Sequence, residues 1–374
     1  MSQKFTELKI GLDEDLEDKI AWLVPNYKSY NILRKSVDAR KRGDVHFVYS
    51  VEVFTQNETL PEEEFPLEPS QFSGSPPLII GSGPAGLFAA LRFVERGVPC
   101  KIFEKGSPTP ERMKAIAKFW RYGQLNPRNN VCFGEGGAGL FSDGKLITRI
   151  KSPYISYVMD RLIKFGAPAE IRYLANPHVG SDRIRRIIPQ LREYLQQKGC
   201  EIYFDTEVKA LLYTHNGVEG IETEHEKKFY SQHVLLACGH SAENLFTHLQ
   251  QNHVSMKGKS FALGLRVEHP QELINRIQYR EQFQHPKLSA ANYKLTFQDQ
   301  KQQLGVYSFC MCPGGYVLSS GTEEQGVVTN GMSNYNRNSK FANAAIVVTI
   351  DHDKSFGSDI FGGLKFRQEM EQAA

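Results

Sequence analysis

Apolar positions between residues 77 and 250 alternate between the spacing of short buried strands and the spacing of amphipathic helices. The clearest helical stripe covers residues 181–198, where apolar side chains recur every three or four positions and Gly199 ends the pattern. The continuous apolar run at residues 78–80 is typical of a buried strand, and a second strand is predicted at residues 98–103. Because strands and helices alternate along this stretch, the sequence predicts an α/β domain built on a parallel sheet.

The two ends of the chain show more strand than helix character. Residues 46–54 are rich in β-branched and aromatic side chains, which favour strands, whereas residues 15–27 start with acids and carry apolar positions at helical spacing. The basic stretch with Lys35, Arg40, Lys41 and Arg42 is predicted to be a solvated loop, with an anion- or partner-facing edge as the alternative. Further strands are predicted at residues 8–10, 201–204, 208–214, 218–224, 261–267, 291–297, 306–311 and 344–350, and a further helix at residues 271–279.

Composition and charge exclude several classes of protein. The 374 residues include 45 Lys and Arg against 42 Asp and Glu, so the net charge of +3 gives no reason to expect a nucleic-acid partner. No apolar run reaches the roughly 18 residues of a membrane span, and the acidic N-terminus lacks the apolar core of a signal peptide. Six cysteines are too few for a disulfide scaffold, and no HExxH or paired CxxC motif indicates a metal site. We therefore expect a cytoplasmic globular protein.

The strongest chemical signal is a glycine-rich turn directly after the predicted strand at residues 78–80. Gly81 permits a tight turn, Gly83 lets a pyrophosphate approach the backbone, and Gly86 allows the following helix to pack closely on the strand. The N-terminus of that helix favours negative charge. Glu104 ends the second predicted strand, where an acid accepts hydrogen bonds from an adenosine ribose. The pattern predicts a dinucleotide-binding fold, with a turn made of Gly81, Ser82, Gly83, Pro84, Ala85 and Gly86.

Both FAD and NAD bind to such a turn, and three features favour FAD. Pro84 stands at the start of the helix, and a long insertion at residues 106–150 suits an extended flavin. The hairpin signal Asn216–Gly217 predicts a three-stranded meander, after which residues 233–239 form a strand that returns to the sheet. A second GxGxxG match has no clean strand before it and is predicted to be a loop that cradles phosphate or flavin; its glycines are Gly134, Gly136, Gly137 and Gly139.

Several long segments resemble the bacterial family of uncharacterised FAD-dependent dehydrogenases, relatives of the glutathione-reductase-like flavoproteins. The matching segments read PPLIIGSGPAGLFAAL, NNVCFGEGGAGLFSDGKLITR, PHVGSDRI, VLLACGHSAEN, FALGLRVEHPQELIN, YSFCMCPGGYV, VVTNGMSNYNR and NAAIVV, and SVDARKRGDVHFVYSVEV resembles the small N-terminal domain of the family. The resemblance implies an FAD-dependent oxidoreductase whose substrate is not established. We also expect NAD(P)H as a transient electron donor. Family members continue further, so we expect the family's C-terminal part to be lacking after the helix that begins near Leu364.

The resemblance also implies which residues contact the flavin. Some of these contacts lie in the first glycine-rich turn and at the end of the second predicted strand. The others lie in the second glycine-rich loop, beside the adenine and after the returning strand. The implied contacts are Gly81, Ser82, Gly83, Pro84, Ala85, Gly86, Glu104, Lys105, Gly134, Gly136, Gly137, Gly139, Lys145, Val208, Ala237 and Gly239.

Composition shifts divide the chain into five parts. Residues 55–76 contain several glutamates and prolines and no basic residue, which is typical of an extended linker. We expect a small N-terminal α/β module at residues 1–54 and an FAD-binding domain with parallel sheet and β-meander at residues 77–250. A mixed α+β substrate or cap domain follows at residues 251–352, and residues 353–374 start a C-terminal segment.

Four residues are candidates for catalysis. His178 and His240 lie at predicted strand or loop ends beside small residues, where they would bind a flavin carbonyl or transfer a proton; the alternative is a histidine that binds loop backbone. Cys310 and Cys312 alternate along a predicted strand, so both thiols would face one side as a redox-active or substrate-facing pair. The alternative for the cysteines is a role as small apolar core residues.

Two classes of function remain open from the sequence. One is an oxidoreductase that passes electrons or hydride through non-covalent FAD to or from an unknown small molecule. The other is a non-catalytic nucleotide-binding or regulatory scaffold whose basic N-terminal module meets a protein partner.

Overall fold

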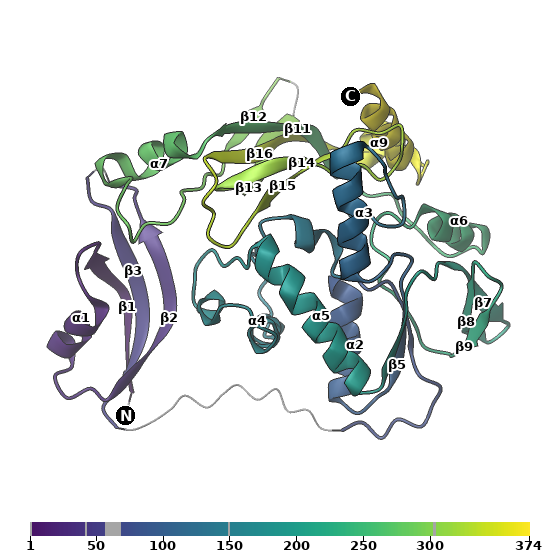
Figure 1. Ribbon diagram of the computed structural model, residues 1–374, viewed down its shortest axis with the longest axis horizontal. Helices are drawn as coiled ribbons and strands as arrows, with labels where there is room; N and C mark the ends of the chain where they lie inside the picture. The colour runs from purple at the N-terminus through teal and green to yellow at the C-terminus, as the bar shows by residue number, and fades with distance from the viewer. Residues whose placement is uncertain (1, 42, 57–68, 149, 302–303) are drawn as a thin grey trace.

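A four-stranded parallel sheet forms the centre of the computed structural model, which describes residues 2–41, 43–56, 69–148, 150–301 and 304–374. Helices α2 (Pro84–Glu95) and α5 (Ser181–Gln197) pack together along the sheet (Figure 1). The predicted parallel α/β architecture is therefore confirmed. The sheet has the order β10-β4-β5-β6, with β10 at Val234–Leu236, β4 at Leu78–Ile80, β5 at Cys100–Phe103 and β6 at Cys200–Tyr203.

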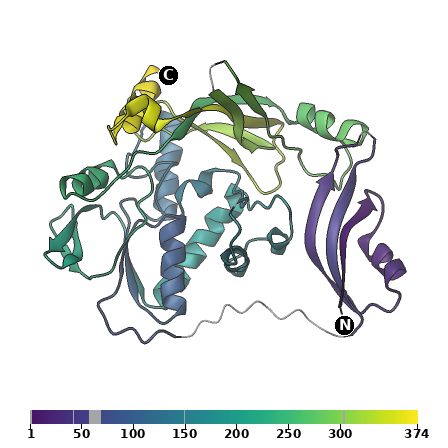
Figure 2. The same ribbon diagram turned by 180° about the vertical axis from the view of Figure 1, so that it is seen from behind.

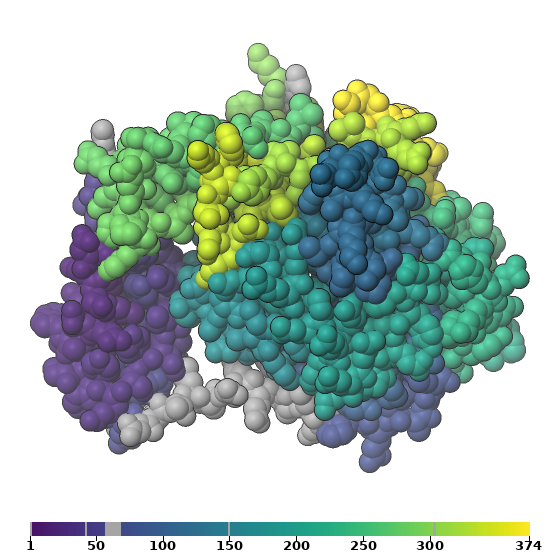
Figure 3. Space-filling view, viewed as in Figure 1, coloured from purple at the N-terminus to yellow at the C-terminus, as the bar shows by residue number. Residues whose placement is uncertain are grey.

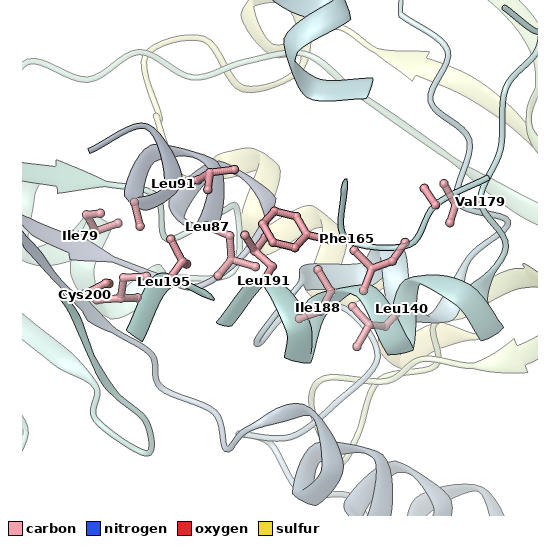
Figure 4. Packing of buried hydrophobic residues seen from close by; sticks show 14 of the residues in the cluster. Ile79, Leu87, Leu91, Leu140, Phe165, Val179, Ile188, Leu191, Leu195 and Cys200 are labelled. Carbon is pink, nitrogen blue, oxygen red and sulfur yellow. The ribbon is translucent and has the colours of Figure 1, made fainter. Parts of the chain in front are cut away.

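The main core lies where the apolar faces of α2 and α5 meet the sheet (Figure 4). Leu91 of α2 and Leu195 of α5 are completely buried, and Ile79 contributes from β4. Burying each such side chain stabilises the fold by about 1.5–3 kcal/mol. The stripe predicted at residues 181–198 thus becomes the buried face of α5. Helices α3 (Thr109–Tyr122) and α4 (Tyr154–Lys164) complete this domain.

A three-stranded meander follows the sheet and confirms the hairpin predicted at Asn216–Gly217. Its strands are β7 (Val208–Thr214), β8 (Gly217–Thr223) and β9 (Lys228–Tyr230). The chain then returns through β10, which pairs in parallel with β4, and continues into α6 (Glu243–Gln251). The carboxyl ends of β4 and β10 therefore lie side by side, beside the start of α2.

An antiparallel sheet forms most of the C-terminal part (Figures 1 and 2). The strand predicted at residues 291–297 is only partly correct, because β12 starts at Thr296 and ends at Asp299. Two further strands, β14 (Gly315–Ser319) and β15 (Thr329–Ser333), were not predicted. The sheet has the order β11-β16-β13-β12, with β11 at Phe261–Pro270, β16 at Phe341–Ile350 and β13 at Leu304–Cys312; the helices are α7 (Gln271–Tyr279), α8 (His352–Phe356) and α9 (Gly362–Ala373).

The N-terminal module is a small sheet with one helix. Strands β1 (Ser2–Gly11), β2 (Ser29–Asp38) and β3 (His46–Phe54) pair in the order β1-β3-β2, and α1 covers Leu16–Leu23. The prediction of a loop at Lys35 is wrong, because Lys35 lies in β2.

Two backbone hydrogen bonds join the edge of the module to the central domain. They run from Lys35 N to Tyr173 O and from Ala175 N to Lys35 O, at 2.8 and 2.9 Å. The space-filling view shows the purple module against the green α7 segment (Figure 3). The predicted linker is not assessed as a whole, since residues 57–68 lie outside the described residues. No described helix has the length and apolar character needed to cross a membrane.

Replacing Gly86 with Ala tests the close packing of α2 on β4. An added Cβ would lie 1.9 Å from the Gly81 carbonyl oxygen, a backbone atom that cannot rotate away. We expect Gly86→Ala to lower the free energy of unfolding by more than about 1 kcal/mol in a urea titration, despite the better helix propensity of alanine. The matched control is Gly83→Ala, because nothing lies within 4 Å of an added Cβ there. Equal unfolding midpoints for the two variants would contradict this packing argument.

Candidate functional site

A cavity of about 730 Å³ opens at the carboxyl ends of β4, β5 and β10. Ligands of open α/β sheets bind at this edge, and the volume lies in the range of small-molecule sites. The cavity brings together many of the residues expected to act on a cofactor. Those that line it are Gly81, Gly83, Pro84, Ala85, Glu104, Lys105, Gly134, Gly137, Val208, Ala237, Gly239 and His240.

The start of α2 presents backbone rather than side chains to the cavity. Gly81 has a φ of 104°, and a Cβ there would lie 2.6 Å from the carbonyl oxygen of Ala237. The close approach of the backbone after β4 to the backbone after β10 therefore requires glycine at this position. Gly83 has open space where a side chain would stand, and Pro84 occupies the first turn of the helix. The first N–H groups of a helix have no partner within it and attract anions. The turn is thus built to receive a negatively charged group such as a diphosphate.

Glu104 is buried at the end of β5 and holds the turn in place. Its carboxylate accepts hydrogen bonds from Ser82 N (2.9 Å), from Ser82 Oγ (2.7 Å) and from Gly106 N (2.8 Å). An ionised carboxylate offers about four acceptor positions, which leaves capacity for one more donor. Ser82 therefore does not line the cavity; it fixes the acid that does. The predicted contact of Glu104 with a ribose stays a prediction.

The second glycine-rich segment packs directly against the first. Gly136 N donates to Ser82 O at 2.9 Å, and a Cβ on Gly137 would lie 2.9 Å from the ring of Pro84. The segment continues into a short 3₁₀ helix at Gly137–Phe141 rather than into an α-helix. It is therefore a loop, as predicted, and not a second strand–turn–helix unit.

Arg112 organises this loop and was missed by the sequence analysis. The side chain, on α3, is completely buried and donates to four carbonyl oxygens at 2.8–3.1 Å, those of Asn130, Val131, Glu135 and Gly137. Burial lowers the pKa of Arg112 to about 10, so the guanidinium stays charged at neutral pH. No local pattern distinguishes this arginine from the basic residues on the exposed face of the same helix.

Glu135 anchors the same loop from its other side. It is completely buried and accepts from Thr109 N and Oγ1, at 2.7 and 2.6 Å, and from Arg192 Nη1 at 3.0 Å. Glu135 thereby joins the start of α3 and the middle of α5 to the loop. Burial of this carboxylate is compensated by the positive charge of Arg192 and by the hydrogen bonds.

His240 lines the opposite wall of the cavity, beside Arg367 of α9. Burial and the nearby charge of Arg367 lower the pKa of His240 below its usual value of 6.5, whereas Glu243 acts in the opposite direction. Arg367 Nη2 lies 2.8 Å from Glu243 and 3.4 Å from Glu323. The final helix is thus attached to α6 and to the segment before β15. The sequence analysis named His240 as a candidate but gave no signal for Arg367.

The other predicted site residues lie outside the cavity lining. His178 Nε2 contacts the carbonyl oxygen of Tyr335 at 2.9 Å and its ring stacks on that tyrosine, as in the structural alternative. Lys145 binds the carbonyl oxygen of Met311. The residues not lining the cavity are Ser82, Gly86, Gly136, Gly139, Lys145, His178, Cys310 and Cys312.

The regular alternation predicted for Cys310 and Cys312 is wrong. The pairing of β13 with β16 shifts between Phe309 and Cys312, and Cys310 has a φ of 46°. This β-bulge redirects the Cys310 side chain. Catalytic roles for His178, His240 and the two cysteines stay predictions. Within the described ranges, no group of three or more His, Cys, Asp or Glu side chains is placed to hold a metal ion.

The parallel sheet, glycine turn and returning meander define a Rossmann-type dinucleotide-binding domain, here joined to a strand-rich C-terminal part. Residues 260–374 match the family model described as "FAD-dependent protein, C-terminal domain-like", and residues 8–54 match a domain of unknown function. An uncharacterized protein of Clostridium beijerinckii is 40% identical over 396 aligned positions, which cover 100% of this chain and 74% of that protein. The chain belongs to the same family as this clostridial protein.

Several solved structures are similar to this chain at low sequence identity. They include the L-amino acid deaminase of Proteus myxofaciens in complex with anthranilate, 16% identical with a TM-score of 0.32, where 54% of this chain aligns with 53% of that one. PqsL of Pseudomonas aeruginosa in complex with 2-aminobenzoylacetate is 11% identical with a TM-score of 0.35, and the alignment covers 75% and 62% of the two chains. CtdE in complex with FAD is 17% identical with a TM-score of 0.31 over 78% and 64%. This chain thus spans about half to two thirds of these proteins.

Removing the Arg112 side-chain charge should loosen the second glycine-rich loop. Arg112→Met leaves four buried carbonyl oxygens without their donors, so we expect the free energy of unfolding to fall by about 3 kcal/mol or more. Arg121→Met on the same helix is the control, because Arg121 is exposed and should change stability by less than about 0.5 kcal/mol. Urea titrations measure the free energy of unfolding of both variants. If Arg112→Met lowers it no more than Arg121→Met does, the buried hydrogen bonds contribute little to stability.

His240 should be neutral at pH 7 and sensitive to Arg367. Since the Arg367 charge lowers the pKa of His240, Arg367→Gln should raise that pKa toward 6.5, and protonation on acidification should begin at a higher pH. Proton NMR titration of the imidazole measures this directly. Arg276→Gln, which removes an exposed arginine on α7, should leave the titration unchanged. A His240 pKa that stays in place after Arg367→Gln would disprove the coupling.

Proposed function

We propose that this protein is an FAD-dependent oxidoreductase that holds FAD non-covalently in the 730 Å³ cavity. The observation that carries the proposal is the open backbone at Gly83, at the N-terminus of α2 and on the cavity wall. A side chain there would occupy the position from which a diphosphate reaches the helix N-terminus. Glu104 at the end of the neighbouring strand supplies the acid that a dinucleotide ribose requires.

The cavity offers a suitable environment along its whole length. The diphosphate would lie over Gly83 and Ala85, the ribose near Glu104 and Lys105, and the adenine beside Val208, as the resemblance implies. The second glycine-rich loop would cover the remaining part, and its backbone is held rigid by Arg112. The match of residues 260–374 to an FAD-dependent protein family supports FAD over NAD as the resident dinucleotide.

FAD, when bound, supplies electron or hydride transfer, and the protein supplies binding and orientation. The neutral imidazole of His240 both accepts and donates a hydrogen bond, so it can bind a polar group of the cofactor or substrate at the cavity wall. Arg367 of α9 lines the cavity as well. We propose a dehydrogenase reaction in which NAD(P)H is the transient electron donor to FAD and a small-molecule substrate accepts the electrons. The proposed location is the cytoplasm, where all six cysteines would remain the free thiols of this structure.

Replacing Gly83 with Val tests the binding site. The valine side chain would stand in the approach to the α2 N-terminus, so we expect at least a tenfold loss of FAD affinity, about 1.4 kcal/mol. Isothermal titration and the visible flavin spectrum of the purified protein measure it. Gly305→Val on β13 is the control, because an added Cβ there meets only a flexible glutamine side chain at 3.4 Å. A Gly83→Val protein that retains FAD as the parent does would show that the dinucleotide binds elsewhere.

The same spectra separate the oxidoreductase from the scaffold. Anaerobic addition of NADH or NADPH should bleach the flavin absorption if either is the donor. Bleaching by dithionite alone would overturn the NAD(P)H proposal, and a protein with no flavin after purification and no affinity for added FAD would overturn the cofactor assignment. A scaffold would bind FAD without accepting electrons from any nicotinamide or substrate.

A further inference from the structure

A second cavity, of about 380 Å³, lies in the N-terminal module, where the module meets the segment after α7. Its volume falls in the range of small-molecule sites. Among the described residues it shares no lining residue with the 730 Å³ cavity, so it is a separate place in the molecule. The lining residues are Ile10, Glu14, Asp15, Leu16, Lys35, Phe47, Tyr49 and Lys287.

The floor of this cavity is one face of the β1-β3-β2 sheet, the face that α1 covers (Figure 1). Tyr49 of β3 pairs directly with Lys35 of β2, and Phe47 of β3 pairs with Ile10 of β1. Residues that pair directly, or lie two apart on one strand, share a face. The floor is therefore apolar and aromatic, with one lysine: Ile10, Phe47 and Tyr49 are only 2, 6 and 8% exposed.

The walls carry charges of both signs. Asp15 precedes α1 and accepts a hydrogen bond from Glu17 N at 2.9 Å through one carboxylate oxygen. Its carboxylate takes part in no ion pair in the part of the chain that the structure describes. Lys287, from the segment after α7, reaches the cavity from the other side, and its Nζ lies 3.4 Å from the Glu14 carbonyl oxygen. A ligand here would contact both the module and the C-terminal part.

Lys35 is the unusual residue of the floor. Its side chain is half-buried, and Nζ lies 4.8 Å from the centre of the Phe47 ring and 5.6 Å from that of Tyr49. An ammonium offers three donors, but within the described residues this one has no hydrogen bond and no ion pair. Cation–π contacts compensate in part for the removal of the charge from water, and an anion would compensate further. The ammonium is thus placed to bind an acidic group.

The Tyr49 hydroxyl is a second donor without a partner. A buried tyrosine hydroxyl usually finds a hydrogen-bond partner, yet this one has none among the residues that the structure describes. Burial and the charge of Asp15 raise the pKa of Tyr49, so the hydroxyl stays protonated at neutral pH and can donate. Because Lys35 and Tyr49 lie opposite each other on adjacent strands, both donors serve the same part of the cavity.

The charges of the cavity select a ligand that carries both signs. A plain carboxylate would bind to Lys35 but would be repelled by Asp15, whose charge already acts on Tyr49. A plain amine would bind to Asp15 but would be repelled by Lys35. A molecule with a carboxylate and an ammonium on neighbouring atoms satisfies both residues, and an apolar group on the same molecule would cover the floor.

We propose that this cavity binds a free α-amino acid with an apolar side chain. Its carboxylate accepts hydrogen bonds from Lys35 and Tyr49, its ammonium binds Asp15, and its side chain packs on Phe47 and Ile10. The amino acid is bound here and not converted, because no reacting group or cofactor is needed for this recognition. The proposal does not depend on FAD.

Calorimetric titration of the full chain tests the class of ligand. Leucine and phenylalanine should bind, and aspartate and glutamate should bind more weakly because the floor is apolar. Isocaproate, which is leucine without its amine, and isoamylamine, which is leucine without its carboxylate, should each bind at least tenfold more weakly than leucine. Failure of every apolar amino acid to bind at millimolar concentration would overturn the proposal. Isocaproate that binds as tightly as leucine would also overturn it.

Variants test the position of the site. Lys35→Met keeps the apolar stem on the rings but removes the ammonium, so leucine affinity should fall at least tenfold. Asp15→Asn keeps a helix-capping side chain and should weaken leucine but not isocaproate. Tyr49→Phe removes only the hydroxyl and should weaken both. The matched control is Lys9→Met, an exposed lysine of β1 that pairs with Val48 on the opposite face.

Circular dichroism melts verify that each variant is folded. Leucine affinity that is unchanged in both Lys35→Met and Tyr49→Phe would place the ligand elsewhere and contradict the assignment. A loss in Lys9→Met equal to that in Lys35→Met would contradict it as well, because the effect would then come from net charge rather than from the cavity.

Discussion

The candidate site depends on a buried arginine that binds backbone. Four carbonyl oxygens, two in the second glycine-rich loop and two in the segment just before it, converge on Arg112. A buried acid of the same loop, Glu135, is bound by Thr109 and Arg192. Glycine-rich backbone loses much conformational entropy on folding and has no side chains to bury. A charged donor inside the fold offsets this cost, because its hydrogen bonds are stronger than those between neutral groups. The loop can therefore be both bare of side chains and well ordered.

This ordered loop gives the cavity one of its walls. Through the bond from Gly136 N to Ser82 O it rests on the first glycine turn, and Ser82 in turn fixes Glu104. The groups proposed to bind the two ends of a dinucleotide are thus connected by three short hydrogen bonds through the protein interior. Such preorganisation reduces the entropy lost when a long, flexible cofactor binds. This arrangement also explains why some residues predicted to contact the flavin face the protein interior, because they position neighbouring residues that line the cavity.

The sequence was sufficient for the parts of the fold that depend on local patterns. The strand, turn and helix around Gly81–Gly86 follow from the spacing of glycines and apolar residues within twenty positions, and the α5 stripe follows from its period. Arg112 could not be recognised, because its acceptors lie 18–25 residues away and only the folded loop brings them together. Lys35 was misplaced because charge alone suggested a loop, whereas its strand is specified by pairing with β3. The bulge at Cys310 likewise results from register against β16, which no local pattern contains.

The same loop extends beyond the cavity and connects it to the C-terminal sheet. After Gly137 the chain runs through the 3₁₀ helix to Asp143, which is bound by Arg337, and to Lys145, which binds the backbone beside Cys310. Removing one partner of a buried ion pair leaves an uncompensated charge, so the loop cannot easily leave the C-terminal sheet. A change in the position of Lys145 would alter its contact with the Met311 carbonyl oxygen in β13, and a change at Gly137 would alter the contact with Pro84. The attachment to the C-terminal sheet and the shape of the cavity therefore depend on one continuous segment, held at its two ends by Arg112 and Arg337.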